Sequence, residues 1–421
     1  MYYFYFLTVK EDIVYHAYRD EMIGFVDLGK NRSHASMVAT KALQFYVRSV
    51  MANYSRPVAF FATKNVHASE LASMFWEVVE SLAGCGLKVI ALVADSASSN
   101  RTLFSYLNHN KQEIPYKCDN VYDPDVPIFL ISDPPHLLKT ACNNVRSSKL
   151  GGSKILKYDS HFILWEHFTQ VPHLFDSQEL KCCKLKETHF SCQSYAKMRV
   201  VYAAQLLSHT VSQLMISRGG DAMTRSAWFA ELMNTWFDLM NTRVKKSANQ
   251  DIAPYYSVDD ARLIWLTDTF LPELLKWHDA VKAEGGKASI RNKKFLSWQT
   301  YKGLVGTTTA IVELIKFLLN NSPTGSYVIT NRINQDPLEA YFSKMRQIGR
   351  TNEMPSIKQY AEYENILVSQ KVLRQEKGAN VKIIDWGNNQ VCDEPLPKRK
   401  KPLTKSAAGC SSWPTIEINK Q

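Results

Sequence analysis

The sequence lacks the features that define several large classes of protein. Among its 421 residues, no apolar run reaches the roughly 18 residues of a membrane-spanning helix, so no membrane partner is expected. Seventeen glycines and 16 prolines are ordinary numbers for this length and argue against a low-complexity chain. The eight cysteines follow no framework spacing, which indicates a reducing compartment. The apolar start, residues 1–7, has no basic region and no cleavage site, so a strand is predicted there instead of a signal peptide.

Positive charge is in excess. Fifty-one Lys and Arg residues against 40 Asp and Glu residues give a formal net charge of +11. Such a balance permits a polyanionic partner, nucleic acid above all, without establishing one. The run Lys398–Lys401, in a polar C-terminal tail, is interpreted as a nuclear import signal or a phosphate-binding arm, and a solvated run of tail charges is the competing interpretation.

The first 147 residues predict alternating strands and helices. Two continuous apolar runs, Lys88–Asp95 and Val126–Asp133, are typical of central strands that are covered on both faces. The other predicted elements are a hairpin of Tyr2–Val9 with Met22–Leu28, a helix His34–Ala52, a strand Pro57–Thr63 and a helix Ala68–Leu82. This order fits an RNase H-like mixed sheet and also other α/β domains.

Helical patterns dominate the next part of the chain, and no strong strand pattern occurs in residues 150–290. The helical segments are Lys197–Ser217, Arg225–Asn241 and Asp259–Ala283. Together they predict a separate helical domain, for which residues 285–294 provide the exit linker. A long apolar helix, Ser297–Leu319, a short extended segment, Tyr327–Thr330, and a helix that begins at Asp336 follow.

Acidic residues stand where strands and helices begin or end. Asp95 and Asp133 each end a buried strand, and sites in open α/β sheets form outside the carboxyl ends of strands. Each can equally be a helix N-cap or a turn residue. Asp336 and Glu339 lie three residues apart on one face of a helix start, where they either reach a metal or simply cap the helix.

A second possible metal site is weaker. Cys182, Cys183, His189 and Cys192 are close in sequence, but their spacing matches no standard zinc finger. Buried or idle thiols are the favoured interpretation.

Three segments together resemble hallmark segments of the P-element transposases, which include THAP-domain-containing host relatives. These are Asp133–Lys139 with the following Asn143 and Asn144, Trp236–Arg243, and Gln335–Phe342, in a resemblance that covers roughly residues 5–370. The resemblance implies an α/β fold in which an RNase H-like mixed sheet is interrupted by a mainly helical, GTP-binding insertion. We therefore predict RNase H-like parts at 1–147 and 291–375, the insertion at 148–290 and a basic tail at 376–421.

The resemblance also implies roles for single residues. Asp95 and Glu339 correspond to the second and third catalytic acids, and Asp336 matches a position linked to a nucleotide-associated metal, so these three are the expected Mg²⁺ ligands. Phe237, Asp238 and Asn241 correspond to the guanine-recognition segment, and Lys184, Arg199 and Val200 look like phosphate or ribose contacts. The residue types suit GTP, because aspartate accepts the two N–H donors of guanine and lysine meets phosphate. An ordinary amphipathic helix is the alternative for residues 237–241.

The sequence departs from the family at the first catalytic acid. Counting back from Gly24 places that acid at Tyr5, and Thr8–Asp12 matches what normally follows. Tyrosine is neutral at pH 7 and is a poor magnesium ligand. Asp27, on the expected partner strand, is the candidate substitute for this acid.

The family's N-terminal THAP domain and coiled-coil segment are also missing from this sequence, so we expect either a decayed element or a start codon assigned too late. The first hypothesis is a transposase body that is catalytically impaired, with DNA, GTP and a second copy of the chain as partners. The alternative is a host-adapted, non-catalytic nuclear factor that binds DNA or protein.

Overall fold

The computed structural model describes residues 2–374 except 18–19, 31–32, 53, 175–183, 191–198, 244–249, 286 and 350–353. It describes the backbone but not the side chains of residues 2–6, 33–35, 250 and 370–374. The chain divides into the units 1–373 and 374–421, and the described residues belong almost entirely to the first. The predicted basic tail and three cysteines of the possible zinc site, Cys182, Cys183 and Cys192, lie outside the described residues.

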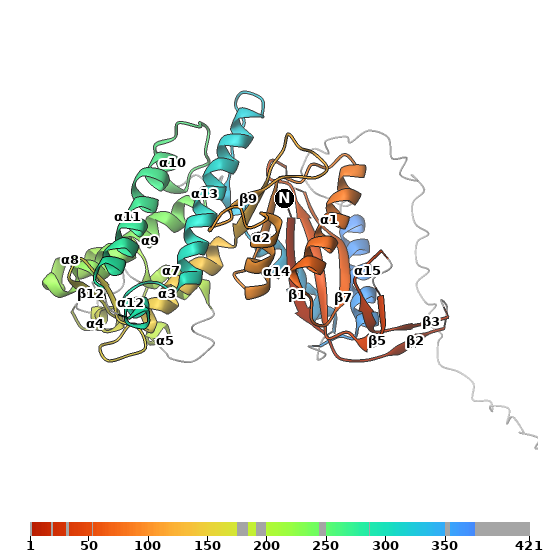
Figure 1. Ribbon diagram of the computed structural model, residues 1–421, viewed down its shortest axis with the longest axis horizontal. Coiled ribbons are helices and arrows are strands. Elements are labelled where there is room, and N and C mark those ends of the chain that lie inside the picture. Colours follow the sequence, from red (N-terminus) through yellow and green to blue (C-terminus); the bar gives the residue numbers. More distant parts are fainter. Residues whose placement is uncertain are drawn as a thin grey trace, which may run out of the picture. The chain divides into compact units, whose positions relative to one another are not determined.

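An eight-stranded mixed sheet forms one part of the first unit (Figure 1). Its order is β5-β4-β7-β6-β1-β8-β10-β9. β8 is parallel to both β1 and β10, whereas β1 is antiparallel to β6. The strands, in chain order, are β1 (Tyr2–Thr8), β4 (Phe25–Asp27), β5 (Ser33–Val38), β6 (Lys41–Arg48), β7 (Ser55–Thr63), β8 (Ala91–Ala94), β9 (Lys117–Cys118) and β10 (Ile128–Ser132).

The predicted central strands are confirmed. Every residue of β8 and β10 is buried, as their uninterrupted apolar sequences require of strands with both faces covered. The strand predicted at Pro57–Thr63 is β7, and the mixed α/β class is correct.

Two predicted elements near the N-terminus are wrong. β1 does not form a hairpin with Met22–Leu28; it pairs with β6, and β3 (Glu21–Ile23) pairs with β2 (Val14–His16) in a separate ribbon. The segment predicted as a helix at His34–Ala52 forms β5 and β6 instead. Ala42–Val47 is buried at six successive positions, and a strand buried on both faces lacks the alternation that distinguishes strand from helix.

Helices cover both faces of the sheet. In Figure 1, α1 (Ala68–Gly84) and α2 (Ser98–Leu107) lie in front of it, and α14 (Asp336–Gly349) and α15 (Ile357–Arg374) lie behind. The rings of Tyr46 in β6 and Tyr341 in α14 have centroids 5.7 Å apart, and those of Phe60 in β7 and Tyr360 in α15 are 5.0 Å apart. Aromatic contacts therefore hold the last two helices against the sheet.

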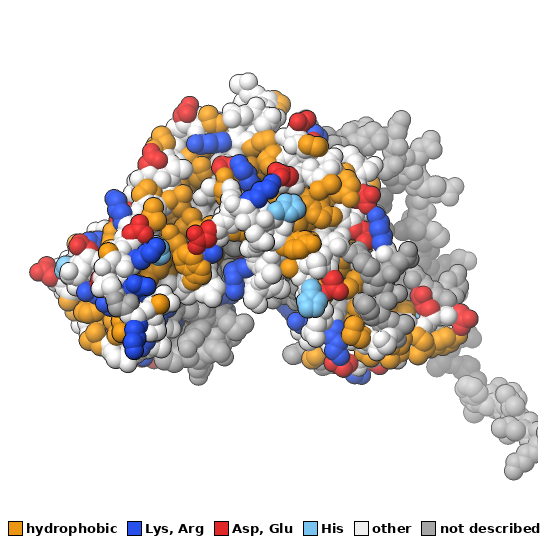
Figure 2. Space-filling view, in the orientation of Figure 1, with side chains coloured by type: hydrophobic (Ala, Val, Ile, Leu, Met, Phe, Trp, Pro, Cys, Tyr) orange, Lys and Arg blue, Asp and Glu red, His pale blue; other side chains and the backbone are white. Residues whose placement is uncertain are grey.

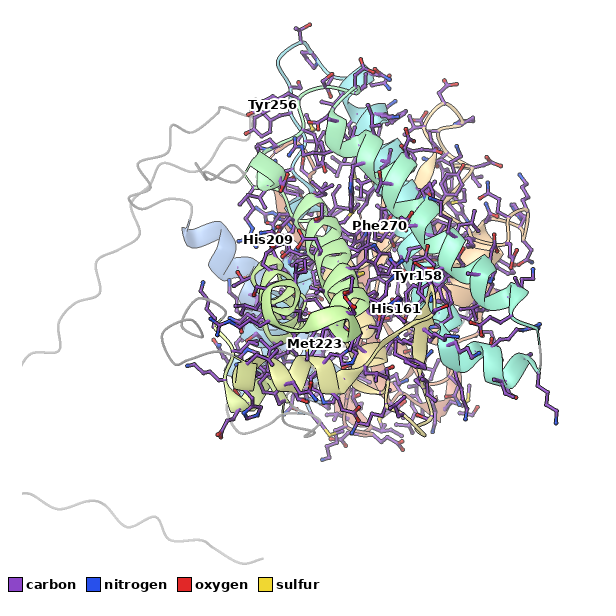
Figure 3. The ribbon with its side chains drawn as sticks, turned by 90° about the vertical axis from the view of Figure 1, so that its left-hand side faces the viewer. Tyr158, His161, His209, Met223, Tyr256 and Phe270 are labelled. Carbon is purple, nitrogen blue, oxygen red and sulfur yellow. The ribbon has the colours of Figure 1, made fainter. Side chains whose placement is uncertain are left out.

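A mainly helical part follows β10, as predicted. Phe270 lies within it and stacks on Trp236 of α9 with ring centroids 5.9 Å apart (Figure 3). A two-stranded ribbon and a short helix, α12, were not predicted; α12 lies where an exit linker was expected. The elements are α3 (Pro134–Arg146), β11 (Leu156–Tyr158), β12 (His161–Ile163), α4 (Trp165–Leu174), α5 (Glu187–Phe190), α7 (Val200–Leu206), α8 (His209–Arg218), α9 (Gly220–Leu239), η2 (Gln250–Ile252), α10 (Ala261–Trp265), η3 (Leu266–Phe270), α11 (Leu271–Ala283) and α12 (Ala288–Lys294).

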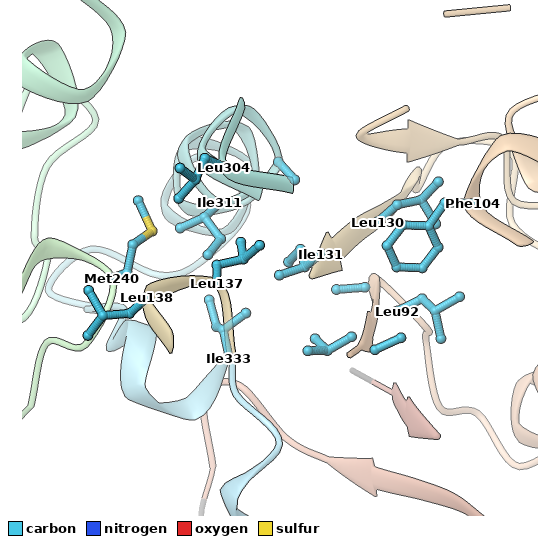
Figure 4. Packing of buried hydrophobic residues seen from close by; sticks show 14 of the residues in the cluster. Leu92, Phe104, Leu130, Ile131, Leu137, Leu138, Met240, Leu304, Ile311 and Ile333 are labelled. Carbon is cyan, nitrogen blue, oxygen red and sulfur yellow. The ribbon is translucent and has the colours of Figure 1, made fainter. Parts of the chain in front are cut away.

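The helix α13 (Trp298–Asn320) joins the sheet and the helical part through one core. In Figure 4, Leu137 of α3 lies next to Ile311 of α13 on the side of the sheet residue Ile131, and Leu138 lies next to Met240 of the helical part; all belong to one buried cluster. By length and composition α13 is a candidate membrane span, but 61% of its apolar window is buried inside the protein. In this fold α13 serves as a core helix.

Candidate nucleotide pocket and sheet-edge acids

Asp95 lies at the carboxyl end of β8, where the sequence placed it. Its Oδ1 accepts hydrogen bonds from the backbone N–H of Ala97 (2.8 Å) and from Nδ2 of Asn100 (2.6 Å). Its side chain is half-buried, so the carboxylate is held in place at the sheet edge and remains partly accessible.

Position 5 lies beside Asp95 on the neighbouring strand. Tyr3 of β1 pairs with Val93 of β8, and continuing this parallel register by two residues sets Tyr5 level with Asp95. On its other side Tyr5 pairs with Gln44 of β6. The backbone thus brings position 5 to the place where a carboxylate would share a site with Asp95.

Asp27 does not lie next to this position, so its prediction as a neighbour of β1 is wrong. It belongs to β4, and β7 and β6 separate β4 from β1 in the sheet. The Asp27 carboxylate instead accepts a hydrogen bond from the backbone N–H of Gly29 at 3.0 Å.

Asp133 is the N-cap of α3 and is only 5% exposed. Its Oδ2 accepts a hydrogen bond from the N–H of His136 (3.1 Å), and its Oδ1 accepts one from the N–H of Gln335 (2.9 Å). Burial, assisted by the charges of Glu339 and Asp336 and opposed by these two hydrogen bonds, raises the pKa of Asp133 to about 7. The capping role weighed from the sequence is confirmed, with an added link to the start of α14.

A cavity of about 780 Å³ opens between α3, α7, α9 and α14. Its volume falls within the range of small-molecule sites. Seven of the nine predicted site residues line it: Lys184, Arg199, Val200, Phe237, Asn241, Asp336 and Glu339. We call this cavity the nucleotide pocket; Asp95 and Asp238 are not among its lining residues.

Several lining residues were missed from the sequence. They are polar or charged and include His136, Lys139, Gln205, Ser208, Thr210 and Arg243. His136 and Lys139 belong to the Asp133–Lys139 segment that carried the family resemblance, so this segment could have identified them as site residues. Arg243 is the last residue of the Trp236–Arg243 segment, which also carried the resemblance, whereas Gln205, Ser208 and Thr210 lie at helix ends that sequence periodicity does not single out.

Charges of opposite sign share the pocket. Four cations line it: Lys139, Lys184, Arg199 and Arg243. Loss of hydration raises the pKa of Glu339, Asp336 raises it further, and Lys139 acts in the opposite direction. The Nδ2 of Asn334 donates to Oδ2 of Asp336 at 2.7 Å and so holds this carboxylate at the start of α14.

Helix geometry explains which residues of α9 and its C-terminal end face the pocket. Phe237 and Asn241 are four residues apart and lie on the same side, whereas Asp238 lies on the neighbouring side. The Oδ2 of Asp238 accepts a hydrogen bond from Nδ2 of Asn234 at 3.2 Å. Burial, followed by the nearby Asp251, raises the pKa of Asp238 to about 6.

The C-terminal end of α9 is tied to the segment that precedes α14. The N–H of Thr242 donates to Oγ1 of Thr330, and the N–H of Thr330 donates to Oγ1 of Thr242, both at 2.9 Å. Nδ2 of Asn331 also donates to Oδ1 of Asn241 at 2.7 Å. The two walls of the pocket that carry Phe237 and Glu339 are therefore fixed to each other.

The predicted magnesium centre is not supported by the arrangement of its ligands. In the part of the chain that the structure describes, no three His, Cys, Asp or Glu side chains are grouped closely enough to hold a metal ion. Asp336 and Glu339 share the pocket, but Asp95 does not line it, and position 5 supplies no carboxylate. The described residues thus do not fit a three-carboxylate metal centre.

The described member of the possible zinc group has other partners. His189 is 2% exposed, and its Nε2 lies 2.6 Å from Oε1 of Gln205. A buried histidine with a hydrogen-bond partner is accounted for without a metal.

A nucleoside triphosphate fits the chemistry of the pocket. The four cations can pair with phosphates, and the ring of Phe237 can stack on a base. The hydroxyl and amide side chains of the lining can form hydrogen bonds with a sugar. Residues that the sequence separates widely are thus gathered in one concave site.

Comparisons with known proteins agree with this geometry. Residues 6–108 match the family described as "TNP-like, RNase H N-terminal domain", and residues 135–252 match "TNP-like, GTP-binding insertion domain". The Transposable element P transposase of Drosophila melanogaster is 27% identical over 323 residues, which make up 75% of this chain and 39% of that protein. The chain thus spans less than half the length of this curated relative. The solved Drosophila P element transposase strand transfer complex is similar with a TM-score of 0.68 and 22% identity, over 89% of this chain and 77% of that chain, a likeness that shows the fold.

Proposed function

Because the chain belongs to the P-element-type transposases, with an RNase H-like domain and a GTP-binding insertion domain, we propose that it is a transposase body that binds DNA and GTP and whose DNA cleavage and strand transfer are impaired. One observation carries this proposal. The nucleotide pocket gathers five of the six predicted nucleotide contacts of the insertion together with Glu339, one of the two predicted catalytic acids of the RNase H-like part.

GTP is the proposed occupant of the pocket. Lys184 and Arg199 would meet the phosphates, Phe237 would stack on the base, and Asn241 would stand beside it. Asp238 would accept hydrogen bonds from the two N–H donors of guanine. Its side chain must then give up the hydrogen bond that it accepts from Asn234. When bound, the nucleotide supplies a charged ligand that helps to position DNA ends, not energy from hydrolysis.

We propose that catalysis is impaired because of the residue at position 5. Asp95 and Glu339 are the retained acids, while the strand position level with Asp95 carries a tyrosine. A phenol offers no negative charge at pH 7 and so replaces a carboxylate poorly. Loss of one member of a catalytic acid set lowers rates by several orders of magnitude, on the order of 10⁴ or more.

The same observation favours a second candidate function. A chain with Tyr5 at that position can act as a non-catalytic nuclear factor that binds DNA or a partner protein and retains GTP binding. We further propose that Lys398–Lys401 direct nuclear import and that the chain self-associates on DNA; unchanged nuclear entry after alanine replacement of all four residues would rule out the import role.

The variant Tyr5→Asp tests whether an acid at position 5 restores activity. Strand transfer of a labelled oligonucleotide with a free 3′-hydroxyl into plasmid DNA is measured with magnesium or manganese, and Tyr5→Asn serves as the matched neutral control. We expect no product from the native chain or the control and a metal-dependent product from Tyr5→Asp. An active native chain contradicts the impairment, and an inactive Tyr5→Asp variant that still binds GTP supports the non-catalytic function.

A further inference from the structure

Two more cavities adjoin the nucleotide pocket. The first, about 450 Å³, shares His136 with the pocket, and the second, about 620 Å³, shares Lys154, Ser297 and Gln299 with the first. We call these two cavities together the basic groove. It begins at Ser96, the residue after Asp95, and runs past the start of α13 to α12.

The lining of the basic groove is cationic. All described residues of the first cavity are polar, and neither cavity has an Asp or Glu among its described lining residues. Besides Lys154, its cations are Arg101, Lys282 and Arg291, and no ion pair to an acid is found for these three in the described part of the chain. Lys and Arg side chains gather over the region that Figure 1 labels α12 (Figure 2).

Two acids lie close to the second cavity. Glu284 pairs with Lys157 and Lys294, which are outside the groove lining. The Oδ1 of Asp279 lies 3.0 Å from Nδ1 of His278, a residue of the second cavity, so this acid offsets one positive charge of the groove. The four cations of the lining outnumber it and leave a net positive charge for an anionic ligand.

Lys154 adds a half-buried charge where the two cavities meet. Its Nζ donates to the backbone carbonyls of Asn292 and Phe295, not to a carboxylate. Loss of hydration lowers the pKa of Lys154 to about 8. A phosphate in the groove would supply the opposite charge that this ammonium lacks.

An aromatic ring stands at the second cavity. Trp298, the first residue of α13, is 42% exposed although it stacks on Tyr301 with centroids 5.4 Å apart. The Nζ of Lys302 lies 4.7 Å from the centroid of the Trp298 ring. An indole held in this way offers a prepared surface to an unpaired base, because base stacking on aromatic side chains is tolerant of sequence.

We infer that the basic groove binds single-stranded DNA, with phosphates on Arg101, Lys282 and Arg291 and a base against Trp298. The inference rests on the proposed function, which it deepens by giving the DNA a path. A strand in the groove ends beside Asp95 at the sheet edge. A single strand fits better than a duplex because the lining forms concave cavities and because stacking on Trp298 requires unpaired bases.

Fluorescence anisotropy of a labelled oligothymidine of about 16 nucleotides tests the groove. The triple variant Arg101→Ala/Lys282→Ala/Arg291→Ala is compared with Lys30→Ala/Lys88→Ala/Lys316→Ala, which removes the same charge from exposed lysines elsewhere. The groove variant should bind at least about tenfold more weakly, and the slope of log affinity against log salt should fall by about 2. Trp298→Ala should weaken binding by roughly fivefold or more, and Trp298→Phe should restore part of it.

Other outcomes separate the inference from the proposed function. If the native chain binds the oligothymidine and both triple variants lose affinity equally, the groove assignment is overturned while the DNA-binding function stands. If a duplex of the same length binds as tightly and depends equally on the groove, the single-strand assignment is overturned. If the native chain binds neither DNA nor GTP, the proposed function itself fails. Thermal melting and GTP titration of each variant check that its fold and nucleotide pocket are retained.

Discussion

The carboxylate of Asp133 accepts a hydrogen bond from the backbone N–H of Gln335, a residue 202 positions later in the chain, at 2.9 Å. The same carboxylate caps α3 through the N–H of His136. One buried side chain thus joins the starts of α3 and α14, on which Lys139 and Glu339 face the nucleotide pocket. The link brings the acids of α14, which are neighbours in sequence, next to Lys139 of α3, which is not.

Replacement of Asp133 by alanine should destabilise the fold. It removes the carboxylate that accepts from the half-buried N–H of His136 and from the buried N–H of Gln335, and the loss of each such hydrogen bond costs about 1–3 kcal/mol. We expect the free energy of unfolding to fall by about 2–5 kcal/mol, measured by urea denaturation, and GTP affinity to fall with it. The exposed Asp119→Ala is the control, with a change within about 0.5 kcal/mol. Equal effects of the two variants would contradict the link.

The pocket cations should control nucleotide affinity. Lys184→Ala and Arg199→Ala each remove a charge that lines the pocket, and a hydrogen bond to a charged group contributes about 1.5–3 kcal/mol. Each variant should therefore bind GTP more weakly by a factor of at least about ten, measured by calorimetric titration. Lys88→Ala, an exposed lysine paired with Asp123, should leave the affinity unchanged. An unchanged affinity in both pocket variants would place the nucleotide elsewhere.

Guanine binding should depend on pH through Asp238. Burial raises its pKa to about 6, so the carboxylate is ionised above pH 7 and becomes protonated as the pH falls through 6. The protonated group loses acceptor capacity for the guanine N–H donors, so the contribution of Asp238 to GTP affinity should be constant between pH 7 and 8 and weaken below 6. Asp238→Asn, which has no proton to gain, should bind GTP more weakly at pH 7.5 and show a smaller change with pH. An identical pH profile in the variant would show that Asp238 does not bind the guanine base.

The central strands and most helices could be predicted from the sequence because their patterns report burial directly. β8, β10, α1 and α13 have continuous or helically spaced apolar residues. β6 could not be predicted, since Ala42–Val47 is buried on both faces and the resulting run has no strand period. The partner of β1 also depends on long-range pairing that local turns do not encode.

The site shows the same division. Phe237 and Asn241 were identified by resemblance, and helix geometry places both at the pocket while it turns Asp238 to the neighbouring side. The hydrogen bond between Asp133 and Gln335 could not be predicted from the sequence. Each residue has a local role that explains it alone, Asp133 as an N-cap and Gln335 as the residue before a helix. Sequence reasoning thus found the residue types of the site, and the fold supplied their combination.

The most direct test of the account is a calorimetric titration of the native chain with GTP and with ATP at pH 7.5. We predict saturable GTP binding and at least about tenfold weaker ATP binding, because adenine lacks the two N–H donors that Asp238 is proposed to accept. The preference should shrink in Asp238→Ala, and both affinities should fall in Phe237→Ala. Absence of binding, or equal affinity for the two nucleotides, would contradict the assignment of this pocket to a guanine nucleotide.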